Sequence, residues 1–224
     1  MSRGGFAQRL PRLWFGERLS PVLLPLLPVS WLFRALVAAR RFLYRRKVLP
    51  SLALPVPVIV VGNLTVGGSG KTPLVLWLAE RLRERGRHPG IISRGYGGDA
   101  DTIRPVLPDS DAAQVGDEPL LLARRSGVPV FVGRDRVAAG SALLAAHPEC
   151  DVLVSDDGLQ HYRLDRCVEI AVFDRRGMGN GCLLPAGPLR EPACRLAGVT
   201  AVVCNGGVAV PAQAGVPHFS MHLV

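Results

Sequence analysis

Residues 56–73 read VPVIVVGNLTVGGSGKTP and carry the pattern on which the fold prediction depends. Residues 56–61 are short and nearly all apolar, as expected of a strand buried in a parallel sheet. A glycine-rich turn follows, and a helical stretch begins near Lys71 and is closed by Gly86. A strand, a glycine-rich loop and a helix in this order are typical of a phosphate-binding loop.

The loop itself predicts a site for a nucleoside triphosphate. Its glycines let main-chain N–H groups converge on phosphate oxygens, and the helix N-terminus adds a partial positive charge. Lys71 is expected to reach the β- and γ-phosphates, and the hydroxyl of Thr72 to reach Mg²⁺. The general pattern G-x-x-x-x-G-K-[ST] begins with glycine, where this chain has Thr65. The residues expected to bind the nucleotide are Thr65, Val66, Gly67, Gly68, Ser69, Gly70, Lys71 and Thr72.

Apolar strand segments alternate with helical segments along the rest of the chain. The expected strands are residues 88–93, 128–132, 151–155, 168–173 and 199–204, and the expected helices are residues 117–125 and 134–146. This alternation predicts an α/β fold, a doubly wound parallel sheet of the P-loop NTPase kind. Ligands of such sheets bind at the carboxyl ends of the strands.

Acidic residues stand at two places where such a fold carries its chemistry. Asp156 and Asp157 follow an apolar strand, where P-loop enzymes place the carboxylates that order Mg²⁺; a solvated surface turn is the alternative. Asp117 is a candidate base that accepts the proton of a hydroxyl receiving a phosphoryl group. It would equally serve as the N-cap of the helix that follows, and the residues alone leave both interpretations open.

The basic charge of the chain is confined to an N-terminal arm, residues 1–50. The whole chain has 27 Lys+Arg against 18 Asp+Glu, a net charge of +9. The arm holds ten of the basic residues and one acid, Glu17, so residues 51–224 have no net charge. A neutral body argues against a nucleic-acid partner, and a basic arm favours an anionic membrane surface. Five cysteines without metal-ligand spacing indicate a reducing compartment.

Residues 31–47 of the arm predict an amphipathic helix. Arginines fall on one stripe of this helix and leucines on the opposite stripe. Pro21, Pro25 and Pro28 interrupt the apolar run that precedes it, so a membrane-spanning helix is not expected. The helix is instead expected to lie on a membrane surface, and packing on its own domain with the arginines in solvent is the alternative.

Five motifs, taken in order, resemble the tetraacyldisaccharide 4'-kinase family of lipid A biosynthesis. They are residues 62–73, then SRGYGG at 93–98, VGDEP at 115–119, DDGLQH at 156–161 and LPAGPLREP at 184–192. The resemblance extends from the arm to about residue 205, and Thr65 is ordinary in that family.

The resemblance implies an ATP-dependent kinase at the cytoplasmic face of the bacterial inner membrane, held there by the N-terminal helix. Its implied acceptor is the 4'-hydroxyl of a tetraacyldisaccharide 1-phosphate, a lipid A precursor, and no protein partner is required. Catalytic roles are implied for Asp117 and Lys71, and Mg²⁺ binding for Thr72, Asp156 and Asp157. Substrate contacts are implied for Arg94, Tyr96, the stretch 134–136 with Arg134, Gln160, His161 and Arg190.

One departure from the family concerns the end of the chain. Members of the family continue into a second, smaller domain that supplies a histidine partner for the catalytic aspartate, whereas His218 and His222 here lie in no matching motif. We therefore expect a kinase domain at residues 51–224 in which nucleotide binding is better preserved than turnover. The alternative is a membrane-associated P-loop switch ATPase or GTPase that regulates a partner, which would need neither Asp117 nor the 184–192 motif.

Overall fold

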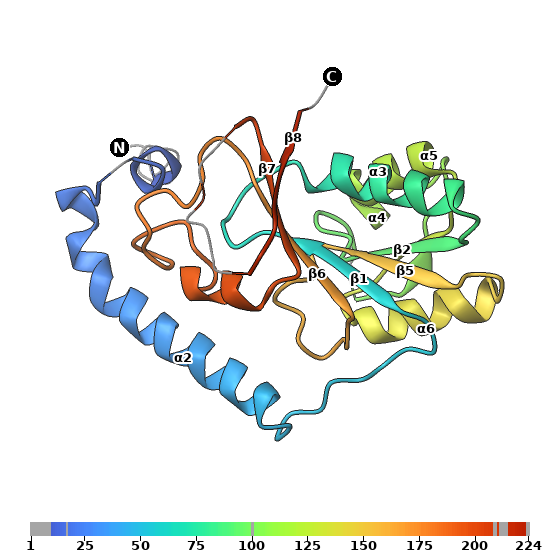
Figure 1. Ribbon diagram of the computed structural model, residues 1–224, viewed down its shortest axis with the longest axis horizontal. Helices are drawn as coiled ribbons and strands as arrows, with labels where there is room; N and C mark the ends of the chain where they lie inside the picture. Colours follow the sequence, from blue (N-terminus) through green and yellow to red (C-terminus); the bar gives the residue numbers. More distant parts are fainter. Residues whose placement is uncertain (1–9, 17, 100, 208–209, 211–214, 223–224) are drawn as a thin grey trace. The chain divides into compact units, whose positions relative to one another are not determined.

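The computed structural model describes residues 10–16, 18–99, 101–207, 210 and 215–222, which belong to two compact units (Figure 1). The first unit comprises Met1–Val48, Asn63–Ser69 and Ala171–Val224, and the second Leu49–Gly62 and Gly70–Ile170. The chain passes from one unit to the other after Val48, after Gly62, after Ser69 inside the glycine-rich loop, and after Ile170 inside strand β6 (Val168–Phe173). The division into an arm at 1–50 and a kinase domain at 51–224 stays a prediction.

The second unit is built on parallel strands. In the sheet order, β3 is followed by β4, β2, β5 and β1, and all neighbours pair in parallel except β3 with β4. The carboxyl ends of the parallel strands therefore share one edge, and the loops that leave this edge carry the predicted motifs. The strands are β1 (Val58–Gly62), β2 (Pro89–Ser93), β3 (Arg104–Pro105), β4 (Val130–Val132) and β5 (Val152–Asp156).

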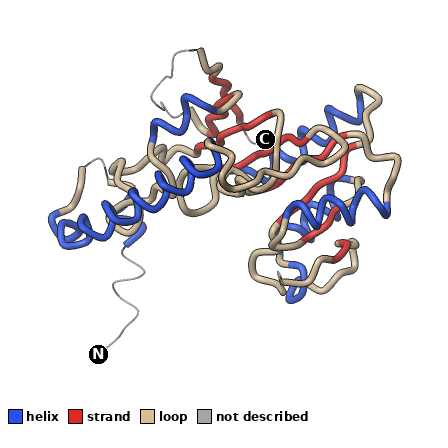
Figure 2. Tube along the Cα trace, turned by 90° about the horizontal axis from the view of Figure 1, so that it is seen from below, coloured by secondary structure: helices blue, strands red, loops and turns tan. Residues whose placement is uncertain are grey.

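Helices cover both faces of these strands. Figure 1 shows α3 and α5 on one side of the strands and α6 on the other; Figure 2 gives the view from below, with strands in red and helices in blue. The doubly wound α/β fold is thus confirmed. The helices of this unit are α3 (Lys71–Glu84), α4 (Ala112–Val115), α5 (Asp117–Ser126) and α6 (Arg136–Ala146).

Local chemistry explains where these helices begin and end. Gly70 precedes α3 in the left-handed region at φ 86°, and Gly127 closes α5 at φ 62°. Asp135 caps α6, because its carboxylate accepts hydrogen bonds from the main-chain N–H groups of Val137 and Ala138.

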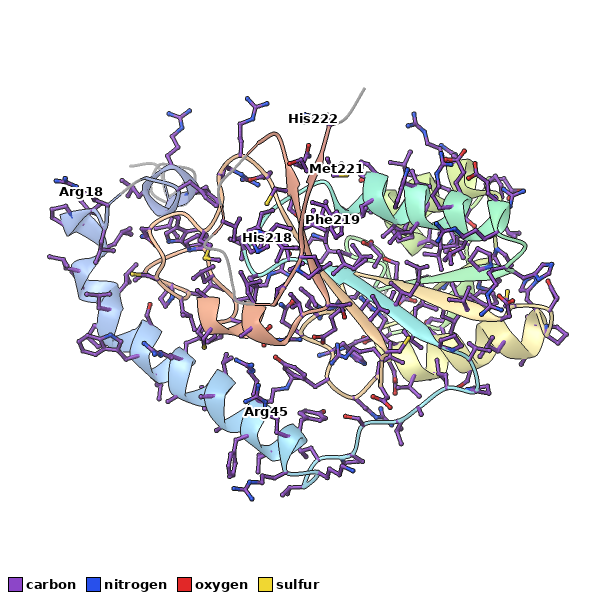
Figure 3. All side chains as sticks on the ribbon, viewed as in Figure 1. Arg18, Arg45, His218, Phe219, Met221 and His222 are labelled. Atoms are coloured by element: carbon purple, nitrogen blue, oxygen red, sulfur yellow. The ribbon has the colours of Figure 1, made fainter. Side chains whose placement is uncertain are left out.

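The first unit contains the end of β6, then β7 (Ala201–Asn205) and β8 (His218–Met221), which pair in parallel. Figure 3 labels His218, Phe219 and Met221 along β8, which is the last strand of the sheet, and His222 just after it. Phe219 is exposed there. The 3-10 helix η2 (Ala193–Gly198) lies between β6 and β7 in the sequence.

The N-terminal helix is longer than predicted. The helix α2 (Leu27–Arg45) directly follows the 3-10 helix η1 (Pro21–Leu26), so the expected interruption by prolines was wrong. Pro28 lies in the first turn of α2, where a residue without an N–H group costs the helix no hydrogen bond. The 25-residue stretch Pro21–Arg45 is long and apolar enough to cross a membrane, a property shared by spanning helices, core helices of soluble proteins and signal sequences.

Leu153→Ala tests the position of the core. Leu153 is fully buried in β5, and a Cβ atom at Gly90 or Gly140 would lie within 3.3 Å of its methyl groups. The substitution should lower the free energy of unfolding by about 3 kcal/mol in urea denaturation. The control Leu107→Ala, at a side chain that is 55% exposed, should change it by less than about 0.5 kcal/mol. Similar losses in both variants would contradict the placement of β5.

Candidate active site

The first half of the glycine-rich loop is shaped by the 184–192 motif, within the first unit. The main-chain N–H of Val66 donates to the carbonyl of Pro188 at 2.9 Å, and that of Arg190 donates to the carbonyl of Leu64 at 2.6 Å. Thr65 and Leu189 form an antiparallel bridge between these two bonds. Two motifs that lie far apart in the sequence are therefore neighbours.

A buried asparagine fixes the turn of the loop. Asn63 Nδ2 donates to the carbonyl of Gly67 at 3.2 Å and to Oγ1 of Thr65 at 3.4 Å. Thr65 does not adopt a positive φ, whereas Gly67 does, at 97°. The usual glycine is dispensable at residue 65 for this reason, and the threonine accepts a hydrogen bond in its place. No role was predicted for Asn63, although it lies within the first motif.

The second half of the loop begins α3, within the second unit. Lys71 is the first residue of the helix and is buried, with its Nζ 3.5 Å from Oδ1 of Asp157. Thr72 follows and is half-buried. The N–H groups of the first helical turn have no partner within the helix, so they can bind an anion.

The two carboxylates after β5 lie in different environments. Asp156 is 1% exposed, and its Oδ2 accepts a hydrogen bond from Ser93 Oγ at 3.4 Å. Burial raises the pKa of Asp156 to about 6; Asp157 and Glu118 also raise it, while Lys71 and Arg136 oppose the shift. The alternative of a solvated turn is therefore wrong for Asp156. Asp157 is half-buried at φ 49°.

Arg136 lies behind this pair rather than on the surface. Its Nη2 donates to the main-chain carbonyl of Asp156 at 3.2 Å, and its Nη1 donates to that of Gly133 at 2.9 Å. Burial lowers the pKa of Arg136 to about 10, and the charges of Asp156 and Asp157 oppose this shift. Arg134, from the same predicted stretch, is exposed and pairs with Asp101 at 3.5 Å. The stretch thus supports the site through Arg136 and not through Arg134.

Asp117 is not the N-cap of α5, which was one of the two interpretations of this residue. Gly116 holds that position at φ 88°, and Asp117 is the first residue of α5, with an exposed side chain. A Cβ atom at Gly116 would lie 2.5 Å from the carbonyl oxygen of Tyr96, so only glycine fits there. The adjacent Glu118 raises the pKa of Asp156, which places the start of α5 within electrostatic reach of the carboxylate pair.

The remaining predicted substrate residues are spread over several loops. Arg94 is exposed directly after β2, and its charge lowers the pKa of Arg136. Tyr96 is 82% exposed in the next turn. Gln160 and His161 are half-buried in the turn after Asp157. Arg190 is half-buried in the first unit, next to the first half of the loop.

The oxygen donors of Thr72, Asp156 and Asp157 suit a Mg²⁺ ion whose remaining ligands are nucleotide phosphates and water. No three His, Cys, Asp or Glu side chains gather into a metal site among the residues that the structure describes. However, Oδ1 of Asp156 is buried without a hydrogen-bond partner. Mg²⁺ in nucleotide sites takes one or two carboxylates and completes its shell with phosphate oxygens and water. Thr72 and one or both of Asp156 and Asp157 fit that role.

The sequence profile of the family described as LpxK, tetraacyldisaccharide-1-P 4'-kinase, matches residues 22–224. The chain belongs to this family. It is 58% identical over 218 residues to the tetraacyldisaccharide 4'-kinase of Dechloromonas aromatica, covering 97% of this chain and 64% of the relative. It is 59% identical over 215 residues to that of an Azoarcus species, covering 96% of this chain and 62% of the relative. The chain thus spans less than two thirds of the length of these kinases.

The fold agrees with that of a solved member of the family. The crystal structure of LpxK from Aquifex aeolicus in complex with ATP superposes with a TM-score of 0.80 at 35% identity. The match covers 89% of this chain and 64% of the other. The relative was crystallised with ATP, and its fold matches most of this chain.

Asp156→Asn tests the charge balance of this kinase-family site. Without nucleotide or Mg²⁺ at pH 7.5, the variant no longer buries an ionised carboxylate, so the free energy of unfolding should rise on the order of 2 kcal/mol. Thermal denaturation measures the change, and Asp109→Asn, at an exposed turn, should leave it unaltered. Mg²⁺ with ATP should raise the melting temperature of the variant less than that of the wild type. A less stable metal-free variant would contradict this reading of Asp156.

Proposed function

We propose that this chain is the nucleotide-binding and catalytic part of a kinase that transfers the γ-phosphate of ATP to the 4'-hydroxyl of a tetraacyldisaccharide 1-phosphate. The observation that carries the proposal is the loop of residues 65–72, which enters α3 with Lys71 beside Asp157. Membership of the family supports the acceptor, and the ATP held by the Aquifex aeolicus relative supports the donor.

The proposed roles follow from the chemistry of each group. Main-chain N–H groups of the loop bind the phosphates, and the Lys71 ammonium reaches the β- and γ-phosphates. Mg²⁺, held by Thr72 and the Asp156–Asp157 pair, neutralises phosphate charge when it is bound. The acceptor oxygen forms its bond to the γ-phosphorus as the bond to the ADP oxygen breaks, and Asp117 accepts the hydroxyl proton.

The lipid disaccharide needs contacts with sugar hydroxyls and with its 1-phosphate. The candidates remain Arg94, Tyr96, Gln160, His161 and Arg190. The two arginines suit the 1-phosphate, because a guanidinium binds phosphate oxygens with two parallel hydrogen bonds. Arg134 is the weakest candidate, since it forms an exposed ion pair with Asp101. The proposed kinase requires no nucleic acid and no protein partner.

The N-terminal stretch Pro21–Arg45 is proposed to hold the enzyme on the cytoplasmic face of the inner membrane, where its substrate lies. Within this stretch only Leu23 and Ser30 are buried, and most of its large apolar side chains are exposed. Figure 3 places Arg18 next to the start of η1 and Arg45 at the end of α2, so basic residues flank the apolar stretch. Arginines in these places suit anionic lipid headgroups.

Asp117→Asn tests the reaction. In a version of the chain extended by the C-terminal region of the Dechloromonas aromatica relative, the wild type should transfer labelled γ-phosphate to tetraacyldisaccharide 1-phosphate. Asparagine cannot accept the proton, so turnover should fall by at least about 100-fold. The Kd for MgATP, measured by calorimetry, should stay within about twofold because the loop is intact.

Lys71→Ala is the comparison for this experiment, because it should lose MgATP binding and turnover together. Equal losses of turnover and ATP affinity in Asp117→Asn would contradict its role as the base. Label released by the wild type only into water would favour the switch ATPase over the kinase.

Leu32→Glu combined with Leu36→Glu tests the membrane contact. Both leucines are exposed on α2, so the double variant should fold normally but bind anionic liposomes at least about tenfold more weakly in a flotation assay. Deletion of residues 1–46 should abolish flotation, and Leu107→Glu, at an exposed leucine of the second unit, should not affect it. Unchanged flotation of the deletion variant would contradict the membrane role of the arm.

A further inference from the structure

Arg176 contacts the glycine-rich loop directly, although no motif of the sequence points to it. Its Nη2 donates a hydrogen bond to the main-chain carbonyl of Gly68 at 2.5 Å. The same guanidinium donates from Nε and Nη2 to Oδ2 of Asp174, at 2.9 and 2.6 Å. One side chain thus joins a carboxylate to a carbonyl of the loop, and all three residues belong to the first unit.

This contact fixes the orientation of one peptide plane in the loop. In a trans peptide the carbonyl and the N–H of the next residue point in opposite directions. Arg176 holds the carbonyl of Gly68, so the N–H of Ser69 must point away from the guanidinium. A phosphate site needs neighbouring N–H groups to converge, and two consecutive glycines would otherwise allow many orientations.

Gly67 allows Arg176 to come this close. A Cβ atom at Gly67 would lie 3.3 Å from Nη2 of Arg176, and the φ of 97° there is one that other residues rarely adopt. The glycine therefore gives both the backbone conformation and the space that the guanidinium occupies.

The N-terminal segment holds Arg176 from another side. The guanidinium carbon lies 4.4 Å from the ring centroid of Phe15, close enough for a cation–π interaction. The residue before it is itself anchored, because Trp14 Nε1 donates to the carbonyl of Pro185 at 2.9 Å and its carbonyl accepts from the N–H of Asn180 at 2.8 Å. Phe15 and Asp174 together restrict the guanidinium to the position from which it reaches the loop.

We propose that Arg176 is a positioning residue for the phosphate-binding loop, holding the Gly68–Ser69 peptide in the orientation that binds phosphate and linking nucleotide affinity to Phe15 in the N-terminal segment. This inference rests on the proposed binding of MgATP. It assigns Arg176 no contact with the reacting atoms.

Calorimetry of MgATP and of magnesium tripolyphosphate with variants of this chain tests the proposal. Arg176→Ala should weaken binding of both ligands about tenfold, because a hydrogen bond from a charged donor orders the loop that both use. Arg176→Lys should recover part of the loss, since one ammonium can reach a carbonyl but cannot also form the fork to Asp174. Phe15→Leu, which keeps apolar contact but removes the ring, should weaken binding about threefold.

Arg175→Ala is the matched control. It removes the same charge from the neighbouring residue, which is exposed as Arg176 is, and it should leave both affinities within about twofold because Arg176, not Arg175, donates the hydrogen bond to Gly68 and the charge alone is screened. The melting temperature of each variant without nucleotide is measured in parallel and should equal that of the wild type.

Three results would overturn the proposal. They are wild-type affinity in Arg176→Ala, an equal loss in Arg175→Ala, and a fall in the nucleotide-free melting temperature that accompanies the loss of affinity. A wild-type chain that is folded but binds no MgATP would instead overturn the proposed function, so the two failures are distinguishable.

Discussion

The ionised carboxylate of Asp156 is buried at the carboxyl end of β5, and the rest of the second unit is arranged around that charge. One of its oxygens accepts a hydrogen bond from Ser93, and an isolated carboxylate at this depth would be costly. Lys71 approaches from α3 and Arg136 from α6, helices that cover opposite faces of the sheet (Figure 1). The strands beside β5 supply two of these groups, because β2 ends at Ser93 and β1 leads through the glycine-rich loop to Lys71, while Arg136 follows β4. The charge that the site uses is therefore kept at a cost to folding stability, which Lys71 and Arg136 reduce but do not remove.

The glycine-rich loop depends on a different constraint, because the backbone of its glycines is flexible and must be held in one conformation. Glycine provides the backbone angles that a phosphate site needs but does not select them. In this chain the selection falls to contacts around the loop: the side chain of Asn63 donates to the carbonyl of Gly67, and the main chain of the 184–192 motif pairs with residues 64–66. Binding a triphosphate then requires less ordering of the loop, so more of the interaction free energy is available for affinity.

Much of the fold was predictable because buried parallel strands leave a simple trace in sequence. The predicted ends of the strands after the loop lie within two residues of those observed, whereas β3 and β8 were missed because they are short and partly exposed. The start of α2 was missed because prolines were read as interruptions, although the first turn tolerates them. Lys71 and the Asp156–Asp157 pair were predictable from their place in the motifs. Arg136 as a buried support was not, because an arginine's burial depends on tertiary contacts that no local pattern records.

The helix α2 buries a polar residue and exposes large apolar ones, the reverse of what is usual for a helix in water. Its buried residue is a serine: Ser30 Oγ donates to the carbonyl of Leu183 at 2.8 Å and accepts from the N–H of Ala186 at 2.9 Å. Trp31, Leu32 and Leu36, which a helix in water would bury, are exposed instead. Hydrogen bonds thus help to attach the helix to its unit, while much of the hydrophobic burial that usually stabilises a helix is missing, because no large apolar side chain of α2 is fully buried. The membrane contact proposed above would supply that missing burial, because a lipid surface offers an apolar phase outside the protein.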